Sequence, residues 1–168
     1  MSTGSVKLLI DTTSCPIQSP QDKALQYEYY EVNKKAHTMK YETGFCATSG
    51  LLCWCSGGWP GRYSDITIAR NSGIFNVLIP GELLVGDKFY IGVEHFITAF
   101  KGSQLSEHQR EWNIEIKRFR QVQERFHGRL KRFNAFTSEW RNERSLHHIA
   151  FLALTHIVNL DVYLHPLN

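Results

Sequence analysis

The long basic segment near the C-terminal end of the chain contains the feature that most constrains the fold. Its apolar side chains recur every three or four residues, which predicts a helix over about residues 106–134 with an apolar stripe along one face. Such a helix needs a sheet or other helices against which to bury its stripe. The stripe consists of Trp112, Ile116, Phe119, Val122, Phe126, Leu130 and Phe133.

Shorter apolar runs elsewhere predict the strands of that sheet. We expect strands at 6–13 and 82–92, and a hairpin of strands 38–47 and 51–56 joined at 48–50. Loops are expected at 14–22 and 57–65, and a connector at 94–109. Residues 24–35 fit either a short strand or a turn of helix. Helices are expected from Ser64, as N-cap, to about residue 78 and over 145–164, where Pro166 ends the second. Mixed strands and helices predict an α/β protein whose sheet is covered by helices.

Length and composition predict one domain of 168 residues with enough apolar side chains, 42%, to fill a core. No run approaches about 18 apolar residues, so we expect no membrane span. The N-terminus lacks the pattern of a secretory signal, which favours an intracellular protein that is not secreted. We interpret the cysteines as buried reduced thiols rather than zinc ligands, and the histidines of the last helix as packing or capping residues. These are Cys15, Cys46, Cys53 and Cys55, and His147, His148 and His156.

Positive charge is concentrated in one part of the chain. Residues 1–109 carry 9 basic and 10 acidic side chains, whereas residues 110–144 carry 10 basic and 5 acidic ones. A local basic excess is typical of a surface that binds a polyanion such as DNA. A solvated helix face without any partner is the alternative.

Acidic residues stand at positions that suggest a metal site. Asp11 and Asp87 each follow an apolar strand, Asp65 follows a Gly-Pro-Gly loop, and Glu124 interrupts the basic helix. If these carboxylates converged they would repel one another unless cations neutralised them. Two Mg²⁺ or Mn²⁺ ions so held can activate water against a phosphodiester. The alternative is that Glu124 is an ordinary surface charge. The sequence contains neither a P-loop nor a nucleophile elbow, and no histidine base is identified for Cys15.

Several strings taken together resemble one protein family. They are "LLIDTTSCPIQSP", "KKAHTMKYETGFCATSGLLCWCSGGWPGRYSDITI", "LLVGDKFYIG", "NIEIKRFRQVQERFHGRLKRF" and the closing "HHIAFLALTHIVNL". Their order is similar to that in DDE superfamily endonucleases of the PIF/Harbinger transposase group, over about residues 6–160. The resemblance implies a ribonuclease H-like mixed sheet flanked by helices. It also implies a nuclear protein that cuts and joins DNA with two divalent metal ions.

The resemblance also assigns roles by position. It implies that Asp11, closing the first strand, acts with Asp87 and Glu124 as the catalytic acids and metal ligands, and that Asp65 is a further ligand. Lys35 and His37 match a basic pair near the scissile strand. The basic helix would then hold DNA phosphates through Lys117, Arg118, Arg120, Arg125 and Lys131.

The sequence departs from the family pattern at Thr12, Arg62 and Phe89, and Phe89 would narrow the site. Only five residues precede the first strand, so the helical DNA-binding region of that group is not expected in this chain. Target choice would then depend on a separate DNA-binding partner, and an oligomer is compatible with this reading. Two functions remain open: an active endonuclease or transposase core, and a catalytically silent, host-adopted module that binds DNA or protein.

Overall fold

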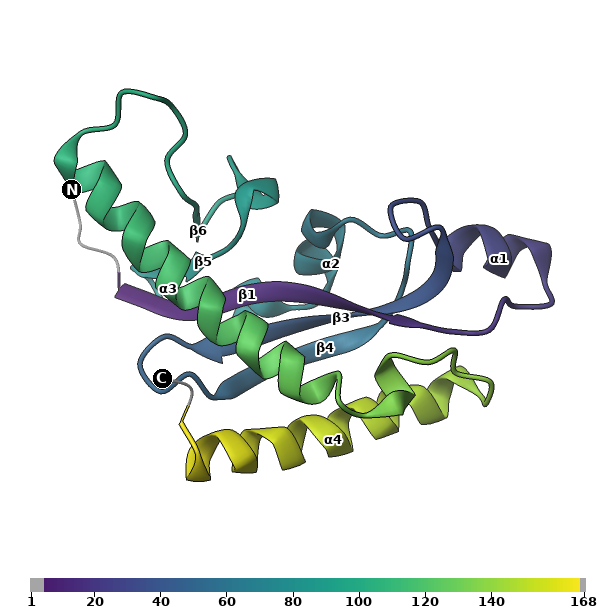
Figure 1. The fold of residues 1–168 in the computed structure, drawn as a ribbon. Helices are drawn as coiled ribbons and strands as arrows, with labels where there is room; N and C mark the ends of the chain where they lie inside the picture. Colours follow the sequence, from purple (N-terminus) through teal and green to yellow (C-terminus); the bar gives the residue numbers. More distant parts are fainter. Residues whose placement is uncertain (1–4, 167–168) are drawn as a thin grey trace.

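A computed structural model describes residues 5–166 and contains one mixed sheet with helices on both faces (Figure 1). The long strand β1 (Ser5–Pro16) lies at its centre, antiparallel to β3 (Ala36–Cys46) and parallel to β5 (Glu82–Val85). Strand β4 (Leu52–Pro60) pairs with β3, β6 (Phe96–Ile97) pairs with β5, and β2 (Tyr30–Glu31) pairs with the start of β3. This mixed sheet flanked by helices agrees with the predicted ribonuclease H-like fold.

Alternating residues of β1 pack into two apolar clusters, one on each face of the sheet. Leu8 and Ile10 belong to one apolar cluster, while Leu9, between them, belongs to the other, as expected from side chains that alternate across a strand. The Leu9 cluster includes Phe126 of α3 (Glu107–Leu130) and Phe151 of α4 (Arg144–Leu164). The other cluster packs under α2 (Asp65–Asn71) and the 3-10 helix η1 (Ile74–Val77).

The hairpin and the longer helices agree with the sequence predictions. Strands β3 and β4 form the expected hairpin, and Ser64 caps α2 by accepting a hydrogen bond from the backbone N–H of Thr67. Helix α3 begins at a capping box formed by Ser106 and Gln109. Its stripe faces the core, with Ile116, Phe126 and Leu130 buried.

Several predicted boundaries were wrong. Strand β1 continues five residues beyond Asp11, which therefore lies inside the strand and does not close it, because β3 pairs with β1 from Leu8 to Pro16. Strand β4 runs to Pro60 through the glycines expected in a loop. Helix α2 stops at Asn71, since Gly73 adopts a left-handed φ of 85°. The strand expected over 82–92 ends at Val85 and is followed by the 3-10 helix η2 (Lys88–Tyr90).

Shorter segments also differ from prediction. Residues 24–35 contain α1 (Lys23–Tyr29) as well as β2, and the expected connector contains β6. Helix α3 ends at Leu130, four residues before the predicted end, and the 3-10 helix η3 (Asn134–Phe136) follows. Within residues 5–166 no helix is long and apolar enough to cross a membrane.

The cysteine prediction was right about the free thiols and partly wrong about burial. All four are free in the described residues, and Cys15 is buried, but Cys46 and Cys55 are half-buried and Cys53 is exposed. His147 is a packing residue, fully buried and hydrogen-bonded to Tyr41 (Nδ1 to Oη, 2.7 Å).

The central strand loses one of its partners near Asp11. Strand β5 pairs with β1 from Ser5 to Leu9, while β3 stays paired with it as far as Pro16. The two parallel strands therefore part just before Asp11. Ligand sites in α/β sheets form where neighbouring strands part in this way.

Candidate functional site

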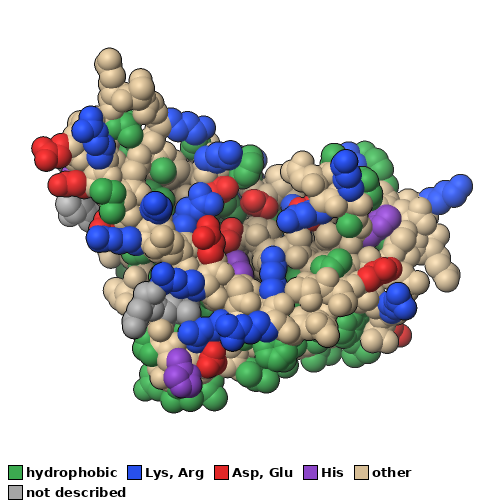
Figure 2. Space-filling model, in the orientation of Figure 1, with side chains coloured by type: hydrophobic (Ala, Val, Ile, Leu, Met, Phe, Trp, Pro, Cys, Tyr) green, Lys and Arg blue, Asp and Glu red, His purple; other side chains and the backbone are tan. Residues whose placement is uncertain are grey.

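A polar cleft of about 520 Å³ opens where β1 and β5 part. Figure 2 shows Lys and Arg side chains around a small group of Asp and Glu at a hollow on the face crossed by α3. The sheet, the start of α2 and the second half of α3 all contribute to the cleft. It is lined by Asp11, Thr12, Thr13, Ser14, Glu31, Asn33, Lys34, Lys40, Asp65, Phe89, Glu124, His127, Gly128 and Lys131.

Asp11 is held at the floor of this cleft by a histidine that sequence reasoning missed. One Asp11 oxygen lies 3.4 Å from Nδ1 of His127, which is buried on α3. The other ring nitrogen lies 3.0 Å from the hydroxyl of Thr43, the residue paired with Asp11 across β1 and β3. Thr43 also donates to the Asp11 backbone carbonyl at 3.1 Å. His127 thereby ties α3 to the two central strands at the acid.

Asp65, at the first position of α2, faces other negative charges. Burial is the largest cause of a raised Asp65 pKa, and the negative charges of Asp87 and Asp11 raise this pKa further. The ammonium of Lys40, 3.8 Å from Oδ1 of Asp65, acts in the opposite direction. The cleft therefore contains carboxylates whose negative charges disfavour one another, and positive charge beside them offsets this effect.

Asp87 stands beside the cleft and does not line it. Its side chain caps η2, with Oδ1 accepting the backbone N–H of Phe89 at 2.8 Å. Phe89 itself is exposed and lines the cleft, where the sequence had suggested that it narrows the site. Asp87 and Asp65 are close enough for the charge of one to affect the other.

Glu124 lies on the polar face of α3, and that face looks into the cleft. Its side chain lines the main cleft and also a neighbouring hollow that Lys117 and Arg120 help to form. One turn later, Gly128 lines the cleft, and apart from its chain neighbours and the backbone of its own helix no described heavy atom lies within 4 Å of the position a Cβ would take there. The glycine therefore leaves open space beside Glu124. Lys131, the C-cap of α3, completes this wall.

The basic residues expected near the scissile strand lie elsewhere. Lys35 is exposed in the turn between β2 and β3, with a positive φ of 53°, and His37 packs edge-on against Tyr30. Lys34 and Lys40 line the cleft in their place. The sequence around these residues does not indicate that Lys34 and Lys40, and not Lys35 and His37, would line the cleft. Lys40 is nevertheless the one lysine in β3.

Two arginines of the predicted DNA-binding set lie outside the lining of the cleft. Arg118 forms an ion pair with Glu115 one turn away on the exposed side of α3. Arg125 is exposed on the same helix. Of the predicted helix set, Lys131 lines the cleft and Lys117 and Arg120 line the hollow beside it.

The donor atoms fit a hard divalent cation, although their spacing in the structure is not that of a closed site. Within residues 5–166 no three His, Cys, Asp or Glu side chains are close enough together to hold an ion. Asp11, Asp65 and Glu124 nevertheless present carboxylate oxygens to one cleft, and Mg²⁺ and Mn²⁺ prefer such oxygens. The repulsion felt by Asp65 is what a bound cation would relieve.

Comparison with known sequences identifies the family. A model of the family described as DDE superfamily endonuclease matches residues 10–165, nearly the whole chain. The chain belongs to the DDE superfamily endonuclease family. It is also 30% identical over 143 residues to a probable transposase for insertion sequence element IS702 from the cyanobacterium Microchaete diplosiphon. That match covers 80% of this chain and 50% of the relative, so the chain spans about half of the relative's length. No solved structure matches the chain significantly.

DDE superfamily endonucleases generally use divalent metal ions, in agreement with the oxygen donors in the cleft. Comparison with the family supports the endonuclease and transposase parts of the resemblance. It leaves the assignment to the PIF/Harbinger group as a prediction.

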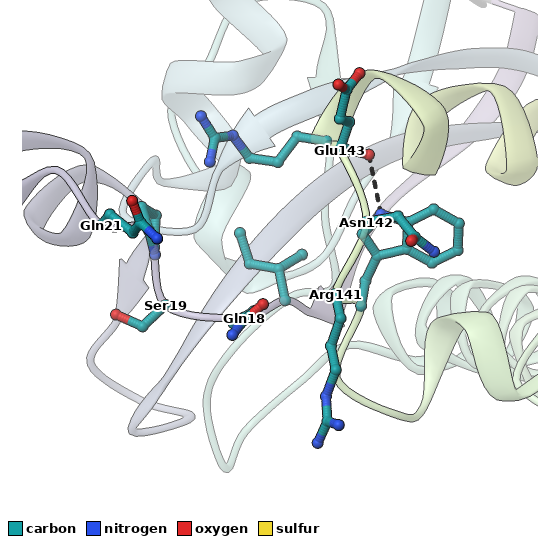
Figure 3. Close-up of a pocket in the computed structure, with 10 residues that line it drawn as sticks. Gln18, Ser19, Gln21, Arg141, Asn142 and Glu143 are labelled. Atoms are coloured by element: carbon teal, nitrogen blue, oxygen red, sulfur yellow. Dashed lines mark hydrogen bonds between the residues drawn. The ribbon is translucent and has the colours of Figure 1, made fainter.

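The DDE superfamily endonuclease chain has a further hollow of about 420 Å³, none of whose lining residues is Asp11, Asp65, Asp87 or Glu124 (Figure 3). Gln18, Ser19 and Gln21, just after β1, form one side, and Arg141, Asn142 and Glu143, just before α4, form the other. The two segments are joined by a β-bridge between Ile17 and Trp140, whose indole N–H donates to the Glu143 carbonyl at 3.0 Å. One carboxylate among these residues is too few to hold two metal ions.

Proposed function

We propose that this chain is the catalytic core of a transposase-type nuclease that hydrolyses DNA phosphodiester bonds and then transfers the freed 3′ end. The observation that carries the proposal is the meeting of Asp11, Asp65 and Glu124 in one cleft, from segments far apart in the sequence. Basic side chains border the cleft, as a polyanionic substrate requires. Membership of the DDE superfamily endonuclease family supports the same reaction class.

Each acid has a proposed role in holding cations. Asp11, Asp87 and Glu124 are the proposed catalytic ligands of Mg²⁺ or Mn²⁺, which prefer carboxylate oxygens such as theirs, and Asp65 assists. When bound, two such ions would lower the pKa of a water molecule and stabilise the leaving oxygen. Asp87 lies outside the lining of the cleft at the start of η2, so its proposed role requires this segment to move toward the cleft.

The basic residues have a separate proposed role in holding DNA. Lys34 and Lys131 line the cleft and would contact phosphates beside the scissile bond, while Lys117 and Arg120 extend that path along α3. Gly128 gives the strand room to approach Glu124. Arg118, Arg125, Lys35 and His37 would contact DNA farther from the chemistry.

The test is metal-dependent nicking of supercoiled plasmid DNA by the parent chain and by Asp11→Asn and Asp87→Ala variants. We expect nicking with Mg²⁺ or Mn²⁺ in the parent and its loss in both variants. Glu111→Gln, an exposed acid on α3, is the matched control and should nick normally. Equal nicking by the parent and the Asp11→Asn variant would refute the proposal.

A catalytically silent module is the second candidate, and one observation favours it. Phe89 occupies part of the cleft while Asp87 stays outside it. If the parent binds DNA but fails to nick it under any metal condition, this second function is the better one. Assignment to the PIF/Harbinger group, a separate DNA-binding partner, an oligomer and a nuclear location are further predictions. Detecting the expressed chain in cell fractions would test the location.

A further inference from the structure

Lys40 is the cation that the chain itself places among the acids of the cleft. It lies on β3, paired with Ser14 of β1 on one side and Trp59 of β4 on the other, so its backbone is fixed in the sheet. Only 12% of its side chain is exposed. A lysine so deeply placed must find compensating partners, because burying an unpaired ammonium is costly.

The three partners of the Lys40 ammonium lie at different distances from it. The ammonium donates a hydrogen bond to the backbone carbonyl of Tyr63 at 2.9 Å. It lies 3.7 Å from Glu31 and 3.8 Å from Asp65, which is within ion-pair range but longer than a hydrogen bond. Glu31 is otherwise satisfied, because its other oxygen accepts from Thr38 at 2.8 Å. The contact between Lys40 and Asp65 is therefore an ion pair without a hydrogen bond, and another cation beside Asp65 could replace the ammonium.

We propose that Lys40 is an internal counter-ion that neutralises Asp65 until a divalent cation binds there, and that its ammonium then turns to a DNA phosphate. This inference rests on the proposed function, since it takes Asp65 as a cation ligand. Both steps follow from charge. A dication beside Asp65 attracts the carboxylate more strongly than an ammonium does, and it repels the ammonium. Lys40 already lines the cleft in which the phosphate would lie.

The consequence is a coupling between the binding of metal and the binding of DNA. Before metal binds, Lys40 is engaged with carboxylates and contributes little to DNA affinity. After metal binds, the same charge is available to the strand. Because binding linkage is reciprocal, DNA should also strengthen metal binding to the same extent. A lysine that merely supports the loop at Tyr63 would produce no such coupling.

The first experiment measures binding of Mn²⁺ alone by electron paramagnetic resonance. We expect Lys40→Gln to bind Mn²⁺ roughly five- to tenfold more tightly than the parent, because a competing charge is gone. Lys40→Arg keeps the charge and should stay within about twofold of the parent. Lys34→Gln is the matched control, since Lys34 lines the same cleft and is exposed, and it should change Mn²⁺ affinity less than Lys40→Gln does.

The second experiment measures affinity for a short duplex with and without Ca²⁺, which replaces Mg²⁺ without supporting cleavage. We expect Ca²⁺ to raise the DNA affinity of the parent more than that of Lys40→Gln.

A third measurement needs no substitution, so it tests the inference even if the Lys40→Gln variant does not fold. Acylation of Lys40 in the parent, followed by peptide mass spectrometry, should become faster when Mn²⁺ is added, while acylation of Lys7, paired with Glu82, should not.

The outcomes separate this inference from the proposed function. Unchanged or weaker Mn²⁺ binding in Lys40→Gln, with binding still dependent on Asp11, would overturn the role of Lys40 and leave the nuclease proposal standing. If that variant binds Mn²⁺ more tightly and the parent does not nick DNA, the counter-ion role of Lys40 is supported and the nuclease proposal is refuted. Absence of Mn²⁺ binding in both chains would overturn both. Slower or unchanged acylation of Lys40 on Mn²⁺ binding would also overturn the inference.

Discussion

Nδ1 of His127, on α3, lies 3.4 Å from a carboxylate oxygen of Asp11, in the middle of β1. The other ring nitrogen contacts Thr43 on β3, so one imidazole connects three elements at the floor of the cleft. A residue in this position helps to fix the orientation of the acid. Such supporting contacts around metal ligands typically matter for both affinity and rate.

We therefore predict that His127→Phe lowers the rate of metal-dependent nicking about 10- to 100-fold. The phenyl ring fills a similar space but removes both polar contacts, so the chain should also lose about 1–3 kcal/mol of unfolding free energy. Nicking rates and urea unfolding measure the two effects. His156→Phe, exposed on α4, is the control. Full activity in a folded His127→Phe chain would show that Asp11 needs no such support.

Glu124→Gln should abolish cleavage while leaving DNA affinity equal or slightly higher. The carboxylate lines the cleft among basic side chains, and its removal takes away one charge that repels phosphate. Plasmid nicking and fluorescence anisotropy on a labelled duplex provide the two readouts, with Glu111→Gln as the control on the same helix. If Glu124→Gln nicks at the parent's rate, Glu124 is an ordinary surface charge.

Lys131→Gln should weaken DNA binding to a similar degree on every DNA sequence. Lys131 caps α3 and lines the cleft, where it is placed to neutralise one backbone phosphate. Removal of one such contact should reduce the slope of log affinity against log salt by about 0.7–0.9. Anisotropy titrations over a series of salt concentrations measure that slope. Lys23→Gln, on the exposed α1, should leave it unchanged, and an unaltered slope in Lys131→Gln would exclude the contact.

Acid should destabilise the fold through His147. Burial, the largest cause, lowers its pKa from 6.5 to about 4, so the unfolded chain takes up a proton that the folded chain does not. The free energy of unfolding therefore does not depend on His147 above about pH 6.5. It decreases by up to about 3 kcal/mol as the pH falls from about 6.5 to 4. Urea unfolding at several pH values tests this. His147→Gln should show a weaker loss over the same range, and an identical pH dependence in both chains would contradict the assignment.

The parts of the fold that periodicity controls were predictable from the sequence. The stripe from Trp112 to Phe133 located α3, and Ser64 and Ser106 marked the starts of two helices. Boundaries controlled by pairing were less predictable. Nothing local to Asp11 shows that β3 continues beside β1 for five more residues. The glycines after Cys55 suggested a loop, because the pairing of Gly57 with Tyr41 is a contact between segments that local sequence does not show.

The sequence named several residues that line the cleft and missed others. Asp11, Asp65 and Glu124 line it, whereas Asp87, the fourth acid that the resemblance named, lies beside it, and the metal-binding roles of all four stay predictions. Lys40 and His127 were missed because each matters through a partner brought close by folding, and no spacing along the chain encodes that. Lys35 and His37 were expected at the cleft, but the turn at Lys35 and the packing of His37 against Tyr30 place them outside it.

The parting of β1 and β5 just before Asp11 has a consequence for how this protein can diverge. Asp11 is anchored on the central strand, whereas Phe89, which also lines the cleft, belongs to the short segment that follows Val85. Insertions or deletions in that segment can reshape the entrance without disturbing the anchored acid. Related chains could therefore acquire new target preferences by changing one peripheral loop while the chemistry at the centre stays constant.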